Sequence, residues 1–561
     1  TRLHAAALRG LTPFVGRKTE IEIFQRLTEQ VTGGKGQILS MVGEAGMGKS
    51  RLVHEFVHRH LAPGWLVVEA PSVSYGKATP YYPVIEMLRH YFSISRNESI
   101  RSIQEKVVDR ALTLDEALAD VIAPILALLD SSADFNIDSS SGLPKLVEQR
   151  QAVIEAVNKF ASIEPQQQRR RIFQALKKVL IRESRRQPLL LIFEDLHWLD
   201  EETQAFLDSL VDSLPLSRIL LLVNYRPGYS DTWSEKTYYT RVRVDPLPPT
   251  GADELLLSLL GDNPECAPFR DLLIKRTEGN PFFVEESVRS LVETGVLVGT
   301  KGAYRPGMQL ETIRIPATVQ TLLADRVDRL RPEEKQLLQA AAVIGVKFPF
   351  KLLRSIVDLT DEDFHSYLGK LQSAEFFYES NLFPDLEYTF KHALTNEVVY
   401  GSLLHERKTS LHAHITSALE GMTEELSHDH FERLAHHAFH GELWERAVRY
   451  LRQTGGKAMG RSAYREAVSC FDRALLSLQK LPSNRRNLEQ MIDLRLDFRN
   501  ALFPLEELDR VIEHLRAAEL LAESLDDRRR LGRICGYLVH FFTLIGDREK
   551  ATAAGIPTAA R

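Results

Sequence analysis

The sequence predicts a multidomain protein in which an α/β core with a parallel sheet is followed by helical domains. Four short apolar runs, at residues 38–42, 65–69, 188–193 and 218–224, have the length and composition of strands buried on both faces. Segments with helical spacing separate these runs, which is typical of a parallel sheet. From about residue 251 onward the spacing is mostly helical. A length of 561 residues exceeds what one hydrophobic core supports, so we expect about three or four domains.

The composition is that of an ordinary globular protein, with 44% hydrophobic and 26% charged residues. A net charge of −5 gives no general attraction to nucleic acids or anionic membranes, so neither DNA nor a membrane is expected as a partner. The three cysteines lie far apart, which argues against a disulfide framework or a cysteine-based zinc site. No apolar run reaches the roughly 18 residues that a spanning helix needs. These features predict a cytoplasmic protein, and because the chain begins at Thr1 and not at Met, we expect a segment of a longer one.

The α/β core is predicted to extend from residue 13 to about residue 250. Residues 1–12 before it have the composition of a linker. Residues 18–33 predict an amphipathic helix that ends in a cluster of glycines, and the first strand follows.

The segment after the first strand matches the phosphate-loop pattern G-x-x-x-x-G-K-[ST] in full, at the strand-to-helix turn where that pattern belongs. Its glycines let backbone N–H groups approach a phosphate chain, and the following helix adds its positive N-terminus. Lys49 would contact the β and γ phosphates, and the Ser50 hydroxyl would bind Mg²⁺. The predicted loop comprises Gly43, Glu44, Ala45, Gly46, Met47, Gly48, Lys49 and Ser50.

Two carboxylates, Glu194 and Asp195, follow the buried strand at 188–193. At the carboxyl end of a parallel strand, such a pair suits Mg²⁺ binding and water activation. We assign the metal to Glu194, through water, and water activation to Asp195. The alternative is that the pair belongs to the start of the helix near Asp200.

Residues 80–186 predict a helical insertion with a mobile loop near 131–143. After the strand at 218–224 comes Arg226, which could reach a γ-phosphate or could simply cap a surface turn. Both interpretations stay open from the residues alone. A short last strand is expected at residues 242–245.

Taken together, these segments resemble the signal-transduction ATPases with numerous domains, a branch of the AAA+ relatives. More narrowly, they resemble the ATPase module that follows the catalytic domain in many bacterial class III adenylate/guanylate cyclases. The resemblance covers nearly the whole chain and rests on Phe14-Val15-Gly16-Arg17, Gly43 to Ser50 with Arg51-Leu52, Phe193 to Trp198 with Asp200, Tyr225-Arg226-Pro227, and Glu278 to Phe283.

This resemblance implies a site for ATP or ADP with Mg²⁺. It implies that Val15, Gly16 and Arg17 border the adenine, with Pro281 on the other side. It adds Arg51 to the phosphate loop, gives Arg226 a sensing role, and places His392 near the β-phosphate of ADP. The acidic pair departs from the family, which has Asp-Asp or Asp-Glu. The basic run Arg169-Arg170-Arg171 could supply an arginine to a neighbouring molecule, but we expect a solvated helical face.

Beyond the core we expect a helical lid at residues 251–314, and the resemblance implies a winged-helix-like domain at 315–415. Short strands are predicted at residues 376–378 and 388–390. Winged helices can bind DNA, whereas the resemblance implies that this one packs against the nucleotide core. The segment has no dense stripe of Lys and Arg with base-reading Asn or Gln, so we favour the packing role.

Residues 416–561 predict tetratricopeptide-like helical repeats that bind a protein or peptide partner. The segments 444–448 and 464–468 share a pattern of an aromatic residue followed three positions later by alanine, and 546–551 is similar to them. The histidines of this region could hold a metal, but without cysteine or carboxylate partners we expect a solvated face. They are His428, His430, His436, His437 and His440.

The sequence, together with this resemblance, predicts an ATP-binding, slowly hydrolysing signalling switch that self-associates in a nucleotide-dependent way. The resemblance implies that the switch regulates an upstream cyclase domain. Any cyclase activity would reside in a domain absent from this chain. Two alternatives are a transcription regulator of the same ATPase class with a DNA-binding output, and a nucleotide-stabilised scaffold without significant turnover.

Overall fold

A computed structural model describes residues 11–72, 80–95, 98–130, 154–160, 162–229, 231–308, 316–381, 386–422 and 430–555. The loop predicted at 131–143, most of the predicted linker at 1–12, and His428 lie outside these residues. The chain divides into two compact units. The first unit comprises residues 1–74, 183–198 and 210–418, and the second comprises residues 75–182, 199–209 and 419–561.

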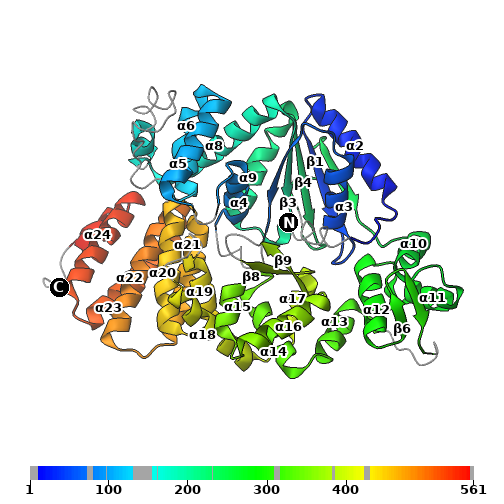
Figure 1. Ribbon diagram of the computed structural model, residues 1–561. Helices are drawn as coiled ribbons and strands as arrows, with labels where there is room; N and C mark the ends of the chain where they lie inside the picture. Colours follow the sequence, from blue (N-terminus) through cyan, green and yellow to red (C-terminus); the bar gives the residue numbers. More distant parts are fainter. Residues whose placement is uncertain are drawn as a thin grey trace. The chain divides into compact units, whose positions relative to one another are not determined.

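A five-stranded parallel sheet in the order β2-β3-β4-β1-β5 forms the centre of the first unit (Figure 1). Every residue of β3 and β4 is buried, as their uninterrupted apolar runs predict. The predicted strands are confirmed to within a residue or so, except that β5 lies earlier than residues 242–245. The bounds are β1 (Gln37–Val42), β2 (Leu66–Ala70), β3 (Leu189–Phe193), β4 (Ile219–Tyr225) and β5 (Tyr239–Arg243).

Helices α2 (Lys18–Thr32) and α3 (Lys49–Glu55) share a hydrophobic core with the sheet. The apolar stripe of α2 buries Phe24, whose ring meets the Phe56 ring edge-on with centroids 4.8 Å apart. A π-helical turn, Phe56–His60, continues α3. The predicted helix at 18–33 is therefore confirmed, and its packing positions the start of the phosphate loop.

The segment predicted as a helical lid contains α10 (Pro249–Leu260), α11 (Ala267–Thr277) and α12 (Pro281–Glu293). An antiparallel hairpin of β6 (Leu297–Thr300) and β7 (Ala303–Pro306) follows and was not predicted. Its strands have four residues each and are mostly exposed, so they carry no apolar run that would indicate a strand.

A three-stranded antiparallel sheet in the order β8-β10-β9 lies downstream, among five helices. The rings of Phe348, Phe377 and Phe390 pack together in it. Strands β9 and β10 were predicted, whereas the three-residue β8 was not. We call residues 316–401 the three-stranded module. Its elements are α13 (Val319–Asp328), α14 (Pro332–Ile344), β8 (Lys347–Pro349), α15 (Phe350–Ile356), α16 (Asp361–Ser373), β9 (Phe377–Asn381), β10 (Glu387–Phe390) and α17 (Ala393–Gly401).

The second unit is helical. Its C-terminal helices pack successively on their sequence neighbours, as a helical solenoid does (Figure 1). The two segments with the aromatic-to-alanine pattern are helix starts, since α20 begins at Trp444 and α21 at Tyr464. Helix α18 (His405–Gly421) leads into the solenoid. The solenoid helices are α19 (His430–His440), α20 (Trp444–Gly460), α21 (Tyr464–Gln479), α22 (Arg485–Leu502), α23 (Leu508–Ser524), α24 (Arg528–Leu544) and α25 (Arg548–Gly555).

Polar contacts join the solenoid to the helical insertion within the second unit. The Arg461 guanidinium donates to both carboxylate oxygens of Asp130, at 3.2 and 2.5 Å. The buried Glu466 carboxylate accepts the Glu202 backbone N–H at the start of α9. The insertion helices are α4 (Tyr82–Tyr91), α5 (Ile100–Leu114), α6 (Ala119–Leu128) and α8 (Pro165–Arg186), and α9 spans Glu201–Val211.

Two expectations of solvated faces are partly wrong. Arg170 and Arg171 are exposed, but Arg169 is half-buried, donates to Glu202 at 2.7 Å and lies over the Phe173 ring. Among the histidines, His430 and His437 are buried in the solenoid. Their helix α19 packs against α20, so the face that holds them is internal.

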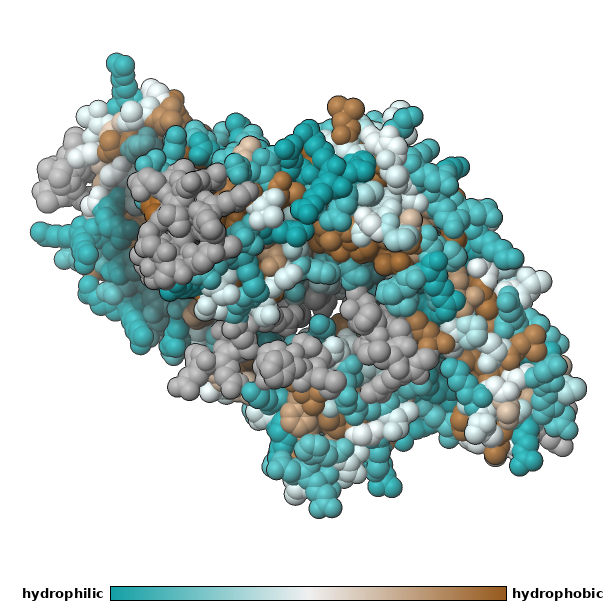
Figure 2. All heavy atoms as spheres, turned by 45° about the horizontal axis from the view of Figure 1, so that its top comes forward, coloured by the Kyte–Doolittle hydropathy of each residue, from teal (hydrophilic) through white to brown (hydrophobic). Residues whose placement is uncertain are grey.

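The face drawn in Figure 2 is mainly hydrophilic, with hydrophobic residues in small groups among polar ones. Within the described part of the chain, no helix is long and apolar enough to cross a membrane.

Candidate nucleotide-binding site

The phosphate loop connects β1 to α3, and its glycines are required by the backbone. Gly46 and Gly48 have φ angles of +85° and +87°, in the left-handed region. A Cβ on Gly46 would also lie 2.8 Å from the Asn280 Oδ1 atom. A Cβ on Gly43 would lie 2.7 Å from the Val244 carbonyl oxygen. Any side chain at 43 or 46 would therefore push the loop away from its neighbours.

Lys49 is the first residue of α3 and is only 9% exposed. Its Nζ donates to the carbonyl oxygens of Gly43 at 2.6 Å and Glu44 at 3.1 Å. Burial lowers the pKa of Lys49, while the negative charge of Asp195 opposes this shift. The half-buried Ser50 follows on the same helix. The loop thus holds one buried ammonium group at the positive end of a helix.

The predicted acidic pair lies at the carboxyl end of β3 and is held by Asn224, on the neighbouring strand β4. The Asp195 backbone N–H donates to Asn224 Oδ1 at 2.9 Å, and Asn224 Nδ2 donates to Glu194 Oε1 at 3.4 Å. Asn224 is 1% exposed, and Asp195 has a φ angle of +55°. Sequence reasoning missed Asn224. Its signal was a polar residue at the end of an otherwise apolar strand.

Arg226 follows β4 directly and pairs with Glu397 of α17. Its two terminal nitrogens donate to the two carboxylate oxygens of Glu397, at 2.7 and 3.3 Å. Burial opposes the Arg226 charge, but the hydrogen bonds to Glu397 outweigh it and raise the pKa of Arg226. Arg226 is also close enough to Lys49 and Asp195 for their charges to interact. Neither sequence-based interpretation of Arg226 included a carboxylate partner.

The turn at residues 15–17 lies between the phosphate loop, the sheet edge and the lid. Val15 is buried in the lid core, and the Gly16 and Arg17 backbones both have φ angles of +65°. The Arg17 side chain donates to the Asp245 carbonyl oxygen at 2.5 Å and to the Met47 carbonyl oxygen at 3.2 Å. The predicted adenine-bordering segment is therefore attached directly to the phosphate loop.

The Gly-Asn-Pro element contacts the same loop from the lid. Asn280 caps α12 by accepting the Phe283 N–H, and its Nδ2 donates to the Ala45 carbonyl oxygen at 3.2 Å. Pro281 is the first residue of α12, where proline is favoured. The Phe282 N–H donates to the Gly46 carbonyl oxygen at 3.3 Å. Pro281 thus lies beside the loop, between two residues that hydrogen-bond to it.

His392 precedes α17 and packs on the lid residue Phe282, with ring centroids 3.9 Å apart. Ala45 of the phosphate loop packs against the hydrophobic cluster that includes Phe282, and so does Val398 of α17. The structure therefore brings His392 close to the phosphate loop, through one intervening aromatic ring.

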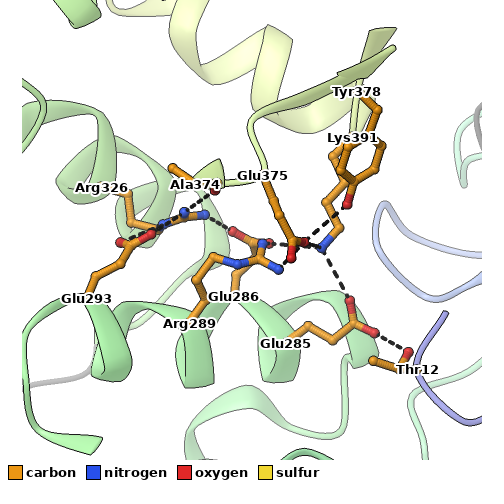
Figure 3. Close-up of polar contacts among 10 residues, drawn as sticks. All are labelled: Thr12, Glu285, Glu286, Arg289, Glu293, Arg326, Ala374, Glu375, Tyr378 and Lys391. Atoms are coloured by element: carbon orange, nitrogen blue, oxygen red, sulfur yellow. Dashed lines mark hydrogen bonds and ion pairs between the residues drawn. The ribbon is translucent and has the colours of Figure 1, made fainter. Parts of the chain in front are cut away.

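A charge network with a buried centre joins the lid to the three-stranded module (Figure 3). Arg326 of α13 pairs with Glu286 and Glu293 of α12 and donates to the Ala374 carbonyl oxygen at 2.9 Å. The side chains of Arg326 and Glu286 are each 2% exposed. We call this set the lid network: Glu285, Glu286, Arg289, Glu293, Arg326, Glu375, Tyr378 and Lys391.

The other half of the lid network centres on Glu375. Arg289 pairs with both Glu286 and Glu375, and Lys391 pairs with Glu375 at 2.8 Å. Burial disfavours the Glu286 anion, but Arg289 and Arg326 outweigh it and hold the pKa of Glu286 at about 2. Lys391 and Arg289 likewise outweigh burial and hold the pKa of Glu375 at about 2. Both carboxylates are ionised wherever the protein is folded at ordinary pH.

Thr12 links the N-terminal segment to this region. Its hydroxyl donates to Glu285 Oε1 at 2.7 Å, as Figure 3 shows, and its carbonyl oxygen accepts from Arg51 of α3 at 3.0 Å. Arg51 also pairs with the buried Glu55 at 2.5 Å. Arg51, predicted to support the nucleotide, therefore contacts the chain segment that enters the core.

Residues 13–223 match the family described as the AAA ATPase domain. The match contains the phosphate loop and the acidic pair but ends before Arg226. An uncharacterized protein of Rhizobium meliloti (strain 1021) is 25% identical over 474 residues, which cover 82% of this chain and 42% of the relative. The matched region therefore spans less than half the length of that relative.

Two solved structures show weaker likeness. A signal-transduction ATPase with numerous domains and a tetratricopeptide repeat sensor, from Pyrococcus horikoshii, aligns over 97% of this chain and 72% of its own, with a TM-score of 0.43 and 14% identity. The Orc1 protein of Aeropyrum pernix in complex with DNA aligns over 70% of this chain and 94% of its own, with a TM-score of 0.27 and 11% identity.

Proposed function

We propose that this chain binds ATP with Mg²⁺ at the phosphate loop and acts as a slowly hydrolysing signalling switch. The observation that carries this proposal is the convergence of charged groups within an AAA ATPase domain. The Lys49 ammonium, the Glu194-Asp195 pair and Arg226 follow three neighbouring strands of one parallel sheet. The carboxyl ends of such strands are where α/β proteins bind nucleotides.

Each side chain has a defined part in this proposal. Lys49 would leave the loop carbonyls to neutralise the β and γ phosphates. Ser50 and Glu194 would hold Mg²⁺, which supplies a Lewis acid that offsets phosphate charge when bound. Asp195, whose backbone is fixed by Asn224, would orient the attacking water. Arg226 would detect the γ-phosphate.

The nucleoside and the β-phosphate involve two further segments. Val15, Gly16 and Arg17 would border the adenine, with Pro281 opposite them, because both segments contact the phosphate loop. His392 would respond to ADP through its position beside Phe282. The three-stranded module, which we interpret as winged-helix-like, would pack on the core and not on DNA.

For the output, we propose an attached domain of the class III adenylate/guanylate cyclase type, with the solenoid binding a protein or peptide that biases the switch. The contacts of Thr12 support an output on the N-terminal side, because this residue of the N-terminal segment is hydrogen-bonded to both Arg51 and Glu285. Nucleotide-dependent self-association would accompany the change of state.

Nucleotide content and phosphate release of the purified chain test the proposal. We expect wild type to retain ATP or ADP, Lys49→Ala to lose it, and Asp195→Asn to keep ATP while phosphate release falls by about 100-fold. Absence of bound nucleotide in a folded wild type would refute the proposal. Binding without any turnover would favour the scaffold alternative.

A further inference from the structure

Helix α17 meets the candidate nucleotide site through three kinds of contact. Its preceding residue His392 packs on Phe282, and its Val398 packs against the cluster that Ala45 also joins. Its Glu397 pairs with Arg226 through two hydrogen bonds. Of these contacts, the ion pair is the one that would involve the γ-phosphate, through Arg226.

The charges around Arg226 explain what the pair does. Arg226 carries the positive charge that a γ-phosphate would need, and it interacts with Lys49 and Asp195 at the site itself. Glu397 brings a carboxylate from outside the core, 171 residues further along the chain. A carboxylate and a phosphate offer the same acceptor geometry to a guanidinium fork.

The pair is also accessible enough to exchange. The side chains of Arg226 and Glu397 are 28% and 36% exposed, so water can replace either partner without leaving a buried charge. Helix α17 itself stays attached to its own module, because Asn396 donates to the Ala342 carbonyl oxygen of α14 at 3.1 Å. Breaking the ion pair therefore detaches α17 from Arg226 and leaves its contact with α14 in place.

We infer that Glu397 competes with the γ-phosphate of a nucleoside triphosphate for Arg226, so that a triphosphate loosens α17 from the core whereas a diphosphate leaves the pair intact. This inference rests on the proposed function. It names the residue through which the three-stranded module opposes triphosphate binding. A ligand shifts such an equilibrium only by its different affinity for the two states, and Glu397 supplies that difference.

Removing the competitor should therefore favour the triphosphate selectively. We expect Glu397→Gln to bind a non-hydrolysable analogue, β,γ-methylene ATP, roughly tenfold more tightly than wild type, with ADP affinity changed less than about twofold. Isothermal titration of the full chain with each nucleotide and Mg²⁺ measures both. Glu362→Gln, an equal charge change at an exposed position of α16, should leave both affinities at the wild-type level.

A double variant identifies the target of the competition. If Glu397 acts through Arg226, the gain from Glu397→Gln disappears in the Arg226→Gln background, because neither competitor has a guanidinium to bind. Equal affinity changes for both nucleotides, or no change in either, would overturn the inference while leaving the proposed function intact. A folded wild type that binds neither nucleotide would overturn both.

Discussion

The lid network and the Arg226–Glu397 pair both join the three-stranded module to the rest of the first unit, but they differ in burial. Arg326 and Glu286 are each 2% exposed and form part of a group of charges that satisfy one another. Arg226 and Glu397 are 28% and 36% exposed and pair essentially with one another. A buried network is difficult to open because each charge would be left without a partner, whereas an accessible pair can exchange. The module is thus fixed to the lid by the lid network, and the Arg226–Glu397 pair holds it to the core through a contact that can exchange with water or another anion.

Matched arginine substitutions in the lid network and in the Arg226–Glu397 pair should lower the free energy of unfolding by different amounts. Arg326→Met would remove the buried cation that Glu286 and Glu293 share, at a cost of about 3–5 kcal/mol. Arg226→Met should cost less than about 1 kcal/mol, because its partner can be hydrated. Calorimetry of the full chain measures both as shifts of the transition that contains the first unit. Equal shifts would refute the contrast.

Acid should weaken the lid network through its depressed carboxyl pKa values. The pKa of Glu286 is about 2 in the fold and 4.5 ordinarily, so its ion pairs stabilise the protein above pH 4.5 and lose that contribution as the pH falls toward 2. The difference in unfolding free energy between wild type and Glu286→Gln should shrink between pH 6 and 3, by about 2 kcal/mol. A pH-independent difference in urea denaturation would contradict this prediction.

A buried carboxylate whose strongest charged neighbours are other carboxylates would sharpen the comparison, and Glu466 of the second unit provides one. Burial, and then the charges of Glu202 and Asp200, raise the pKa of Glu466 to about 8. Its contribution to stability is therefore complete below pH 4.5 and declines as the pH rises to 8, the opposite sign to Glu286. Glu466→Gln should be more stable than wild type at pH 8, by roughly 1–2 kcal/mol, and not at pH 5. If Glu466→Gln changes the melting temperature by the same amount at pH 5 and at pH 8, the prediction is wrong.

Much of the fold follows from local patterns in the sequence. The strands β3 and β4 are uninterrupted apolar runs, and the phosphate loop is a contiguous motif whose glycines carry their own conformational requirement. The strands β6, β7 and β8 escaped prediction because three or four half-exposed residues leave no periodic signal.

The partners of the site residues could not be predicted in the same way. Asn224, Glu397 and Arg326 act through side chains that are 30, 171 and 40 positions away from their partners Glu194, Arg226 and Glu286. A single sequence shows which charges exist but not which of them meet, because pairing depends on how distant segments pack. The motif residues were therefore predictable, and the connections between them were not.

Amide hydrogen exchange across α17 tests most directly whether nucleotide state moves the three-stranded module. Full-length wild type would be compared with saturating ADP and with saturating β,γ-methylene ATP, each with Mg²⁺. We predict that amides at residues 393–401 exchange faster with the triphosphate analogue, while those of α13 at Val319–Asp328, held by the lid network, exchange equally in both. Identical protection of α17 in the two nucleotides, with both shown to be bound, would contradict the switch.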